Sequence, residues 1–253
     1  MLADGGEAVA ARGGQAHAGG AVVVMTTATQ LGRADLPDLM TLMTGDEKHG
    51  PSATSTLDVL WVLYDRVLRV DPRRPDDPDR DRFLLSKGHG PMAYYAVLAA
   101  KGFLTTDDLR SFGRSDSILG YHPDRTLVPG VEISAGSLGH GLGLAVGTAL
   151  GLRIAGRTAR VVVLVGDAEL EEGSNMEAIQ YAGRVGLANL TAVVIDNASA
   201  SLGWPDGVGR RFTVEGWTGV DVDGRDHDAL ERAFRPPSAT PHVVVAHVEP
   251  KEA

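Results

Sequence analysis

Asp167 and Asn197 are the residues of this chain best suited to hold a metal ion. Asp167 comes after the β-branched run 161–165 (VVVLV), and Asn197 comes after a second run, 191–196 (TAVVID). Because a helical stretch, about 173–187, separates the runs, they predict a parallel βαβ unit whose strands end at one edge of a sheet. Open parallel sheets bind ligands beyond that edge. A carboxylate and an amide oxygen there predict a site for Mg²⁺, which takes about six oxygen ligands and accepts phosphate among them.

The rest of the chain supplies further elements of the same kind of fold. Runs at 219–222 and 243–248 predict two more strands on either side of a helix-like segment, 226–234. Helical spacing or composition predicts earlier helices at 54–68, 92–101 and 138–154. Strands that alternate with helices predict an α/β fold with a doubly wound, mostly parallel sheet and helices on both faces.

Size, charge and composition limit the kinds of protein this can be. At 253 residues and 43% hydrophobic content the chain can form one large domain, which we expect at 31–253. Residues 1–30 are rich in Ala and Gly without periodic apolar positions and predict a disordered tail. The net charge of -9 disfavours binding to nucleic acid or an anionic membrane, and no apolar run approaches a membrane span. With no cysteine there is no disulfide framework, and we expect a cytoplasmic protein.

The segment GDAELEEGSNMEA, followed by NLTAVVIDNAS, resembles the thiamine diphosphate signature in its transketolase form. The resemblance implies the thiamine diphosphate-binding fold and a bound Mg²⁺ held by Asp167, Asn197 and the backbone carbonyl of Ser199. It also implies a cofactor-binding surface formed by Gly136, Ser137, Leu138, Gly166, Asp167, Ala168, Glu169 and Asn197. Two positions depart from the family pattern, because Ala168 stands where glycine is usual and Met176 where tryptophan is usual.

Three further segments resemble transketolases in the same order along the chain. FLLSKGHGPMAYYAVLAAKGFL carries His89, which the resemblance places at the cofactor and substrate. LGYHPDRTLVPGVEISAGSLGHG carries His122, placed near the substrate, and the looser match HGPSATSTLD carries His49. Histidine suits proton transfer and hydrogen bonding to substrate oxygens because its pKa lies near neutrality. In total the resemblance covers residues 36–248.

The resemblance implies a transketolase-like transferase that is active only with a second subunit. Glu172 matches a family glutamate at the subunit interface, near the acid that touches the aminopyrimidine ring of the cofactor. Complete transketolases carry a pyrimidine-binding domain after the segment matched here, so we expect a C-terminal transketolase-like subunit to supply it. The small side chains of 138–154 favour close self-association, and we expect an α2β2 assembly. Its reaction would transfer a ketol unit between sugars, with the carbon chemistry supplied by the cofactor.

Other interpretations compete with these. Taken alone, Asp167 could cap a helix and Asn197 could belong to a turn. The run Glu169, Glu171 and Glu172 is typical of a solvated charged face. GSLGHGLG is similar to a dinucleotide-binding loop but lacks the strand and acid that such loops need. At the level of function, the alternatives are another thiamine diphosphate reaction, such as acyl transfer or decarboxylation of a 2-oxo acid, and a non-catalytic cofactor-binding scaffold.

Overall fold

The computed structural model describes residues 31–43, 50–235 and 239–250 of the chain. The chain from Leu31 onward forms one compact unit. The tail predicted at 1–30 and the candidate His49 both lie outside the described residues. Within the described part, no helix has the length and apolar character that crossing a membrane requires.

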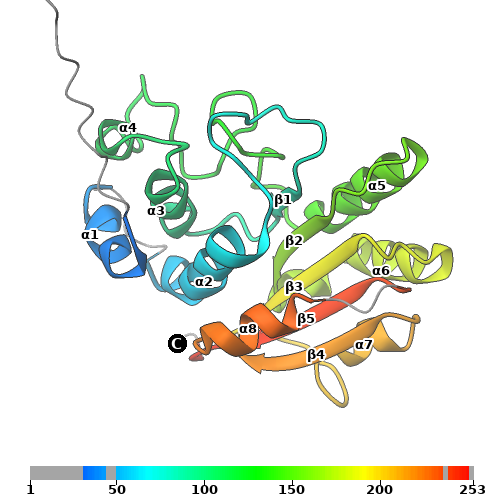
Figure 1. Cartoon of the computed structure of the whole chain (residues 1–253). Helices are drawn as coiled ribbons and strands as arrows, with labels where there is room; N and C mark the ends of the chain where they lie inside the picture. The colour runs from blue at the N-terminus through cyan, green and yellow to red at the C-terminus, as the bar shows by residue number, and fades with distance from the viewer. Residues whose placement is uncertain (1–30, 44–49, 236–238, 251–253) are drawn as a thin grey trace, which may run out of the picture. The chain divides into compact units, whose positions relative to one another are not determined.

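A parallel sheet lies at the centre of this unit (Figure 1). Its five strands are β1 (Arg82–Leu85), β2 (Val161–Gly166), β3 (Leu190–Asp196), β4 (Thr218–Asp223) and β5 (His242–His247). Their order across the sheet is β1-β2-β3-β5-β4, and each neighbouring pair is parallel. Because β2 and β3 are neighbours, with Gly166 level with Ile195, the predicted metal ligands follow two adjacent strand ends.

Helices cover both faces of this sheet (Figure 1). The α-helices of the described residues are α1 (Leu36–Thr41), α2 (Gly50–Val62), α3 (Met92–Ala100), α4 (Thr106–Arg110), α5 (Gly141–Ile154), α6 (Gly173–Val185), α7 (Arg210–Thr213) and α8 (His227–Ala233), of which α1 and α4 pack on α3. Shorter helical turns are η1 (Arg33–Asp35), the π-helical η3 (Leu63–Val67) that continues α2, and η4 (Ala168–Glu171).

The side chains of each central strand divide between two hydrophobic clusters. Val162 and Leu164 of β2 pack in a cluster with α1, α2, α3 and α8, whereas Val161, Val163 and Val165 pack in a second cluster with α5 and α6. Burial on both faces explains why β2 is a continuous apolar run and not an alternating one. The doubly wound α/β fold predicted from the sequence is confirmed.

Most predicted elements are present, with shifted ends. The helix predicted at 138–154 begins at Gly141, because the residues before it form a loop at the candidate site. The helix predicted at 92–101 ends beside Gly102, whose φ of 82° fits the expected glycine cap. Strand β1 (RFLL) was missed, because it is short and has none of the β-branched residues that mark the other buried strands.

Candidate active site

Asp167 and Asn197 follow the carboxyl ends of the neighbouring strands β2 and β3. Both are buried, with Asp167 3% exposed and Asn197 5% exposed. The backbone N–H of Asp167 donates to the carbonyl of Ile195 at 3.1 Å, which extends the pairing of the two strands as far as the acid. The residues predicted to bind Mg²⁺ therefore share one edge of the sheet, where open parallel sheets bind ligands.

The loop after β3 folds back onto Asp167. The N–H groups of Ser199 and Ala200 donate to Oδ2 of Asp167 at 2.6 and 3.0 Å, and the Ser199 hydroxyl donates to Oδ1. Ala198 turns the chain with a left-handed backbone, φ 53°, which residues with a side chain seldom adopt. These contacts place the segment around Ser199 against Asp167, as a metal site that uses both residues requires.

The amide oxygen of Asn197 has no hydrogen-bond partner among the described residues. This atom, Oδ1, is fully buried, and buried polar atoms nearly always have a partner. The donor set fits Mg²⁺, which prefers carboxylate and amide oxygens and completes its shell with water or phosphate. No cluster of three or more His, Asp or Glu side chains in the described residues could hold a metal alone. Further ligands would therefore come from the backbone and from a bound phosphate.

Glu169 is buried within the site, which corrects the expectation of a solvated acidic face. It is 3% exposed, and its carboxylate accepts hydrogen bonds from the Ser86 hydroxyl and from the N–H groups of Gly139 and Gly166, the last two at 3.2 Å. Burial raises the pKa of the Glu169 carboxyl, and these hydrogen bonds, together with the nearby charge of Lys87, only partly oppose that effect.

The other two acids of the run do lie toward solvent. Glu171 is partly exposed and accepts hydrogen bonds from the Leu202 N–H at 2.5 Å and the Ser201 hydroxyl at 2.8 Å, which lower the pKa of its carboxyl. Glu172 is exposed at the start of α6. The alternative of a solvated run is therefore wrong for Glu169 alone, because the η4 turn directs successive side chains to different sides. That Glu169 belongs to the cofactor surface stays a prediction.

His89 and His122 face one another on an accessible surface. Their ring centres are 5.7 Å apart with the planes at 52°, and both residues are exposed. Gly88 permits this approach, because an added Cβ there would lie 3.1 Å from the His122 ring and 2.9 Å from the Cβ of Ala135. Two of the histidines predicted to act near the substrate are thus neighbours, while the position of His49 is outside the described residues.

The glycine-rich segment before α5 serves close packing. Gly136 has a φ of 115°, and a Cβ on it would lie 3.2 Å from the ring of His122. A Cβ on Gly141 would lie only 2.2 Å from Oγ of Ser86, so a larger residue would push the two loops apart. The remaining cofactor candidates of this segment, Ser137 and Leu138, are exposed.

Ala168 and Gly166 lie in a turn that tolerates the departure from the family pattern. Ala168 opens the η4 turn and is not among the non-glycine residues with positive φ, so alanine in place of glycine adds no backbone strain there. Gly166 lies against the stem of Lys87, since an added Cβ would be 3.4 Å from its Cδ. Lys87 and Ser86 were not predicted as site residues, although both directly precede Gly88 and His89.

A cavity of about 230 Å³ opens beside Asp167. Among its walls is Arg211, whose guanidinium carbon lies 4.7 Å from the ring centre of Trp204 and whose Nη2 lies 2.9 Å from the sulfur of Met176. Burial lowers the pKa of Arg211. Met176, which stands where tryptophan is usual, thus contacts this arginine. Neither Trp204 nor Arg211 was identified from the sequence, because their segment carries no recognised motif. The complete lining is Asp167, Glu171, Asp196, Ala198, Ala200, Gly203, Trp204, Gly207, Val208 and Arg211.

Comparison with known proteins identifies relatives along most of the chain. Residues 40–242 match the family model described as transketolase, thiamine diphosphate binding domain. A Rhodococcoides fascians protein named ferredoxin fas2 is 56% identical over 227 residues, which cover 89% of this chain and 75% of that protein. An apulose-4-phosphate transketolase subunit from Actinobacillus succinogenes is 37% identical over 209 residues, which cover 79% of this chain and 75% of that protein.

Solved structures agree with the sequence relatives. Transketolase from Leishmania mexicana superimposes with a TM-score of 0.70 and 25% identity, over 86% of this chain and 37% of that one. This chain therefore spans little more than a third of that transketolase. The family match and the structural likeness each cover most of this chain. The chain belongs to the family of transketolase thiamine diphosphate-binding domains.

Proposed function

We propose that this chain is the diphosphate-binding subunit of a two-chain, transketolase-like enzyme that transfers a ketol unit. The observation that carries the proposal is the buried, unpaired amide oxygen of Asn197 at the strand end next to that of Asp167, a donor pair suited to Mg²⁺ with a diphosphate as further ligand. The family supports thiamine diphosphate as that ligand. When bound, the cofactor supplies the electron sink for breaking a carbon–carbon bond of the sugar.

The residues of this chain would bind and orient the reacting groups. Asp167, Asn197 and the carbonyl of Ser199 would hold the metal, while the segments 136–138 and 166–169 would line the cofactor. His89 and His122 are exposed and near enough to one another to contact one substrate, so they would hydrogen-bond its oxygens and exchange protons with them.

The proposal includes a second polypeptide. The Actinobacillus relative and a Clostridium relative, 6-deoxy-6-sulfo-D-fructose transketolase subunit SqwG, are subunits by name, and the matched residues cover 75% and 72% of them. We propose that a complementary subunit supplies the pyrimidine-binding domain, meets Glu172, and forms an α2β2 assembly with this chain. Exposed apolar side chains on α5 and α6 would be covered in that assembly: Leu144, Ile154 and Tyr181.

A thiamine diphosphate reaction that consumes a 2-oxo acid is the second candidate. The 56% identity to a relative named as a ferredoxin and not as a transketolase is compatible with a different reaction of the same cofactor. Iron–sulfur clusters are held by cysteine thiolates, and this chain contains no cysteine. The residues of this chain therefore lack the ligands for such a cluster.

Reconstitution separates these functions. The chain, its complementary subunit, Mg²⁺ and thiamine diphosphate are expected to transfer ketol units from ketose donors to aldose acceptors. Consumption of 2-oxo acids in place of ketoses would select the second candidate. The Asp167→Ala variant is expected to abolish metal-dependent cofactor binding and activity together. Full activity of the complex with that variant would instead indicate a non-catalytic scaffold.

A further inference from the structure

Glu169 joins three loops that come from distant parts of the sequence. We name them the histidine loop (86–90), the glycine loop (136–141) and the diphosphate turn (166–169). The carboxylate accepts one hydrogen bond from each of them, from the Ser86 hydroxyl, the Gly139 N–H and the Gly166 N–H. These loops carry His89, the exposed residues before α5 and Asp167, which are the groups proposed to meet the cofactor and substrate.

We propose that Glu169 is a positioning residue that fixes these three loops as one preformed cofactor surface before the cofactor arrives. The inference deepens the proposed function and rests on it for the identity of the ligand. Because the three loops are already held together, they lose less conformational entropy when the cofactor binds, and the affinity for the cofactor is higher. Glu169 acts through the loops, since its carboxylate oxygens are directed to their donors.

The chemistry of the contacts requires a carboxylate. All three partners are donors, and an ionised carboxylate is the side-chain group that offers acceptors on both oxygens and no donor. Oε1 accepts from Ser86 and from Gly139, and Oε2 accepts from Gly166. A glutamine would direct its NH₂ group at one of these donors, and an aspartate would be shorter by one methylene group. Glu169→Gln therefore breaks at least one bond with almost no change of volume.

Additional bonds extend the connection beyond the carboxylate. The Ser86 hydroxyl also accepts from the N–H of Gly141 at 3.1 Å, which ties the start of α5 to the histidine loop. The side chain of Asn175, which is fully buried, donates to the backbone carbonyl of Glu169 at 2.6 Å and holds the diphosphate turn against α6. The positive charge of Lys87 lies close enough to stabilise the buried carboxylate. These contacts fix the position of Glu169, so its carboxylate can keep the three loops in place.

A purely structural role makes a different prediction. If Glu169 served only global stability, its replacement would lower the unfolding temperature while folded molecules bound the cofactor normally. A positioning role predicts that the three loops open locally while the rest of the unit stays closed. Hydrogen exchange resolved by peptide distinguishes the two in the cofactor-free full chain, so this readout does not depend on the proposed function.

The experiment compares wild type, Glu169→Gln, Ser86→Ala and the double variant, with Glu231→Gln as matched control. Glu231 lies on α8, where it pairs with Arg66 and Arg235 away from the three loops. We expect exchange at the amides of Gly139, Gly141 and Gly166 to speed up about tenfold in Glu169→Gln. Ser86→Ala should speed up Gly141 most. The double variant should show less than the sum of the two effects, because both residues act through one shared bond.

Cofactor titration is the second readout. Trp204 lines the cavity beside Asp167, so tryptophan fluorescence is a suitable signal for thiamine diphosphate at fixed Mg²⁺. The Kd is expected to rise about tenfold in Glu169→Gln and to stay unchanged in Glu231→Gln.

Unchanged exchange in all three loops would overturn the positioning role whatever the titration shows. Wild-type chain and complex that bind no thiamine diphosphate would overturn the proposed function, while the exchange result would still decide the role of Glu169. Should Glu169→Gln fail to fold, Ser86→Ala alone tests the same connection.

Discussion

The sheet has one edge at the amino ends of its strands and one at their carboxyl ends, and the buried acids at these two edges have opposite pKa shifts. Asp81, just before β1, is buried and bonded to the guanidinium groups of Arg69 at 2.9 Å and Arg160 at 2.7 Å. Burial by itself would raise its pKa, but the hydrogen bonds from these arginines lower the pKa of Asp81 below its ordinary value. Glu169, beyond the carboxyl end of β2, is just as buried, yet neutral groups supply its hydrogen bonds, and its pKa is raised.

The difference agrees with the proposal that a ligand binds at the carboxyl ends of the strands. At the amino ends of β1 and β2 the charge of Asp81 is balanced by two arginines, so the carboxylate there needs no bound cation. At the carboxyl ends of β2 and β3, backbone and hydroxyl donors satisfy the geometry of Asp167 without cancelling its charge. The unpaired oxygen of Asn197 adds to this negative character. A divalent cation would complete the second edge as the arginines complete the first.

The largest effect is expected from Asp167→Asn. This change keeps the size of the side chain and removes its charge, so it should weaken thiamine diphosphate binding at fixed Mg²⁺ by roughly 100-fold or more, given what lesser changes around metal sites cost. The stability of the cofactor-free chain should change little, because no arginine is left unpaired. Fluorescence titration and thermal unfolding measure the two quantities. If the variant bound the cofactor as tightly as wild type, the proposal that the carboxyl ends of the strands bind the metal and cofactor would be wrong.

Asp81→Asn should show the reverse pattern. Only the carboxylate is buried here, since the side chains of Arg69 and Arg160 are 56% and 31% exposed, so the change removes hydrogen bonds to charged groups at a cost of about 2 kcal/mol. The free energy of unfolding in urea should fall by that amount, while cofactor affinity at a temperature where the variant is folded should equal that of wild type. A loss of affinity with full stability would mean that the amino edge also belongs to the site.

Acid unfolding provides a third, smaller test. The pKa of Asp81 is lower in the folded chain than its ordinary value of about 3.9, so its contribution to stability is fully present above that pH. It is lost as the pH falls from about 4 through the folded-state pKa. Wild type should therefore lose stability more steeply below about pH 4 than Asp81→Asn, which lacks the titrating group. Parallel urea midpoints for the two proteins from pH 5 to pH 3 would contradict this assignment.

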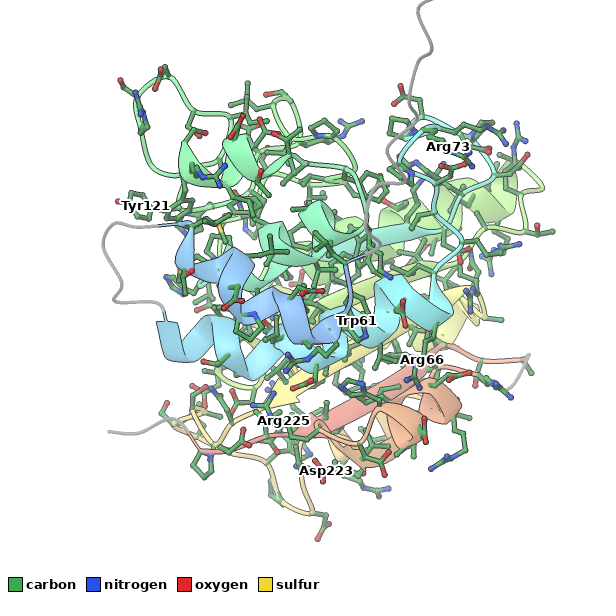
Figure 2. The ribbon with its side chains drawn as sticks, turned by 60° about the vertical axis from the view of Figure 1, so that its left-hand side comes forward. Trp61, Arg66, Arg73, Tyr121, Asp223 and Arg225 are labelled. Carbon is green, nitrogen blue, oxygen red and sulfur yellow. The ribbon has the colours of Figure 1, made fainter. Side chains whose placement is uncertain are left out.

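The smallest effect is expected from Arg66→Gln. Arg66 lies in η3 and pairs with Asp228 and Glu231 of α8, and Figure 2 shows it beside that helix. Exposed ion pairs contribute little because water already stabilises their charges. The unfolding temperature should match wild type within error. A shift as large as that of Asp81→Asn would show that pairing with arginine, and not burial, determines the contribution at the amino edge.

The sequence predicted the parts of this molecule that depend on local patterns. Two apolar runs and the helix between them were sufficient to predict β2, α6 and β3, and adjacent strand ends then brought Asp167 and Asn197 to one edge. The fold class and the family follow from these elements and from motif order. The roles of the individual site residues stay predictions.

The parts that escaped prediction depend on contacts between distant segments. Glu169 looked like one acid of a solvated run, because nothing near it in the sequence indicates that Ser86 and Gly139 supply its donors. The start of α5 was placed too early, because nothing near Gly139 in the sequence shows that it adopts a left-handed backbone, φ 80°, and donates its N–H to Glu169. Arg225 is a similar case, since it reaches across from the end of β4 to Asp58 of α2 (Figure 2).

The left-handed turn at Ala198 affects how much conformational entropy the loop after β3 loses when a ligand binds. Glycine would reach this conformation without strain, but it would also let the loop visit many others. Alanine is somewhat strained in this conformation, but its backbone has fewer accessible conformations than that of glycine. The loop that carries Ser199 to Asp167 therefore has fewer conformations to lose when a ligand binds, which lowers the entropic cost of binding.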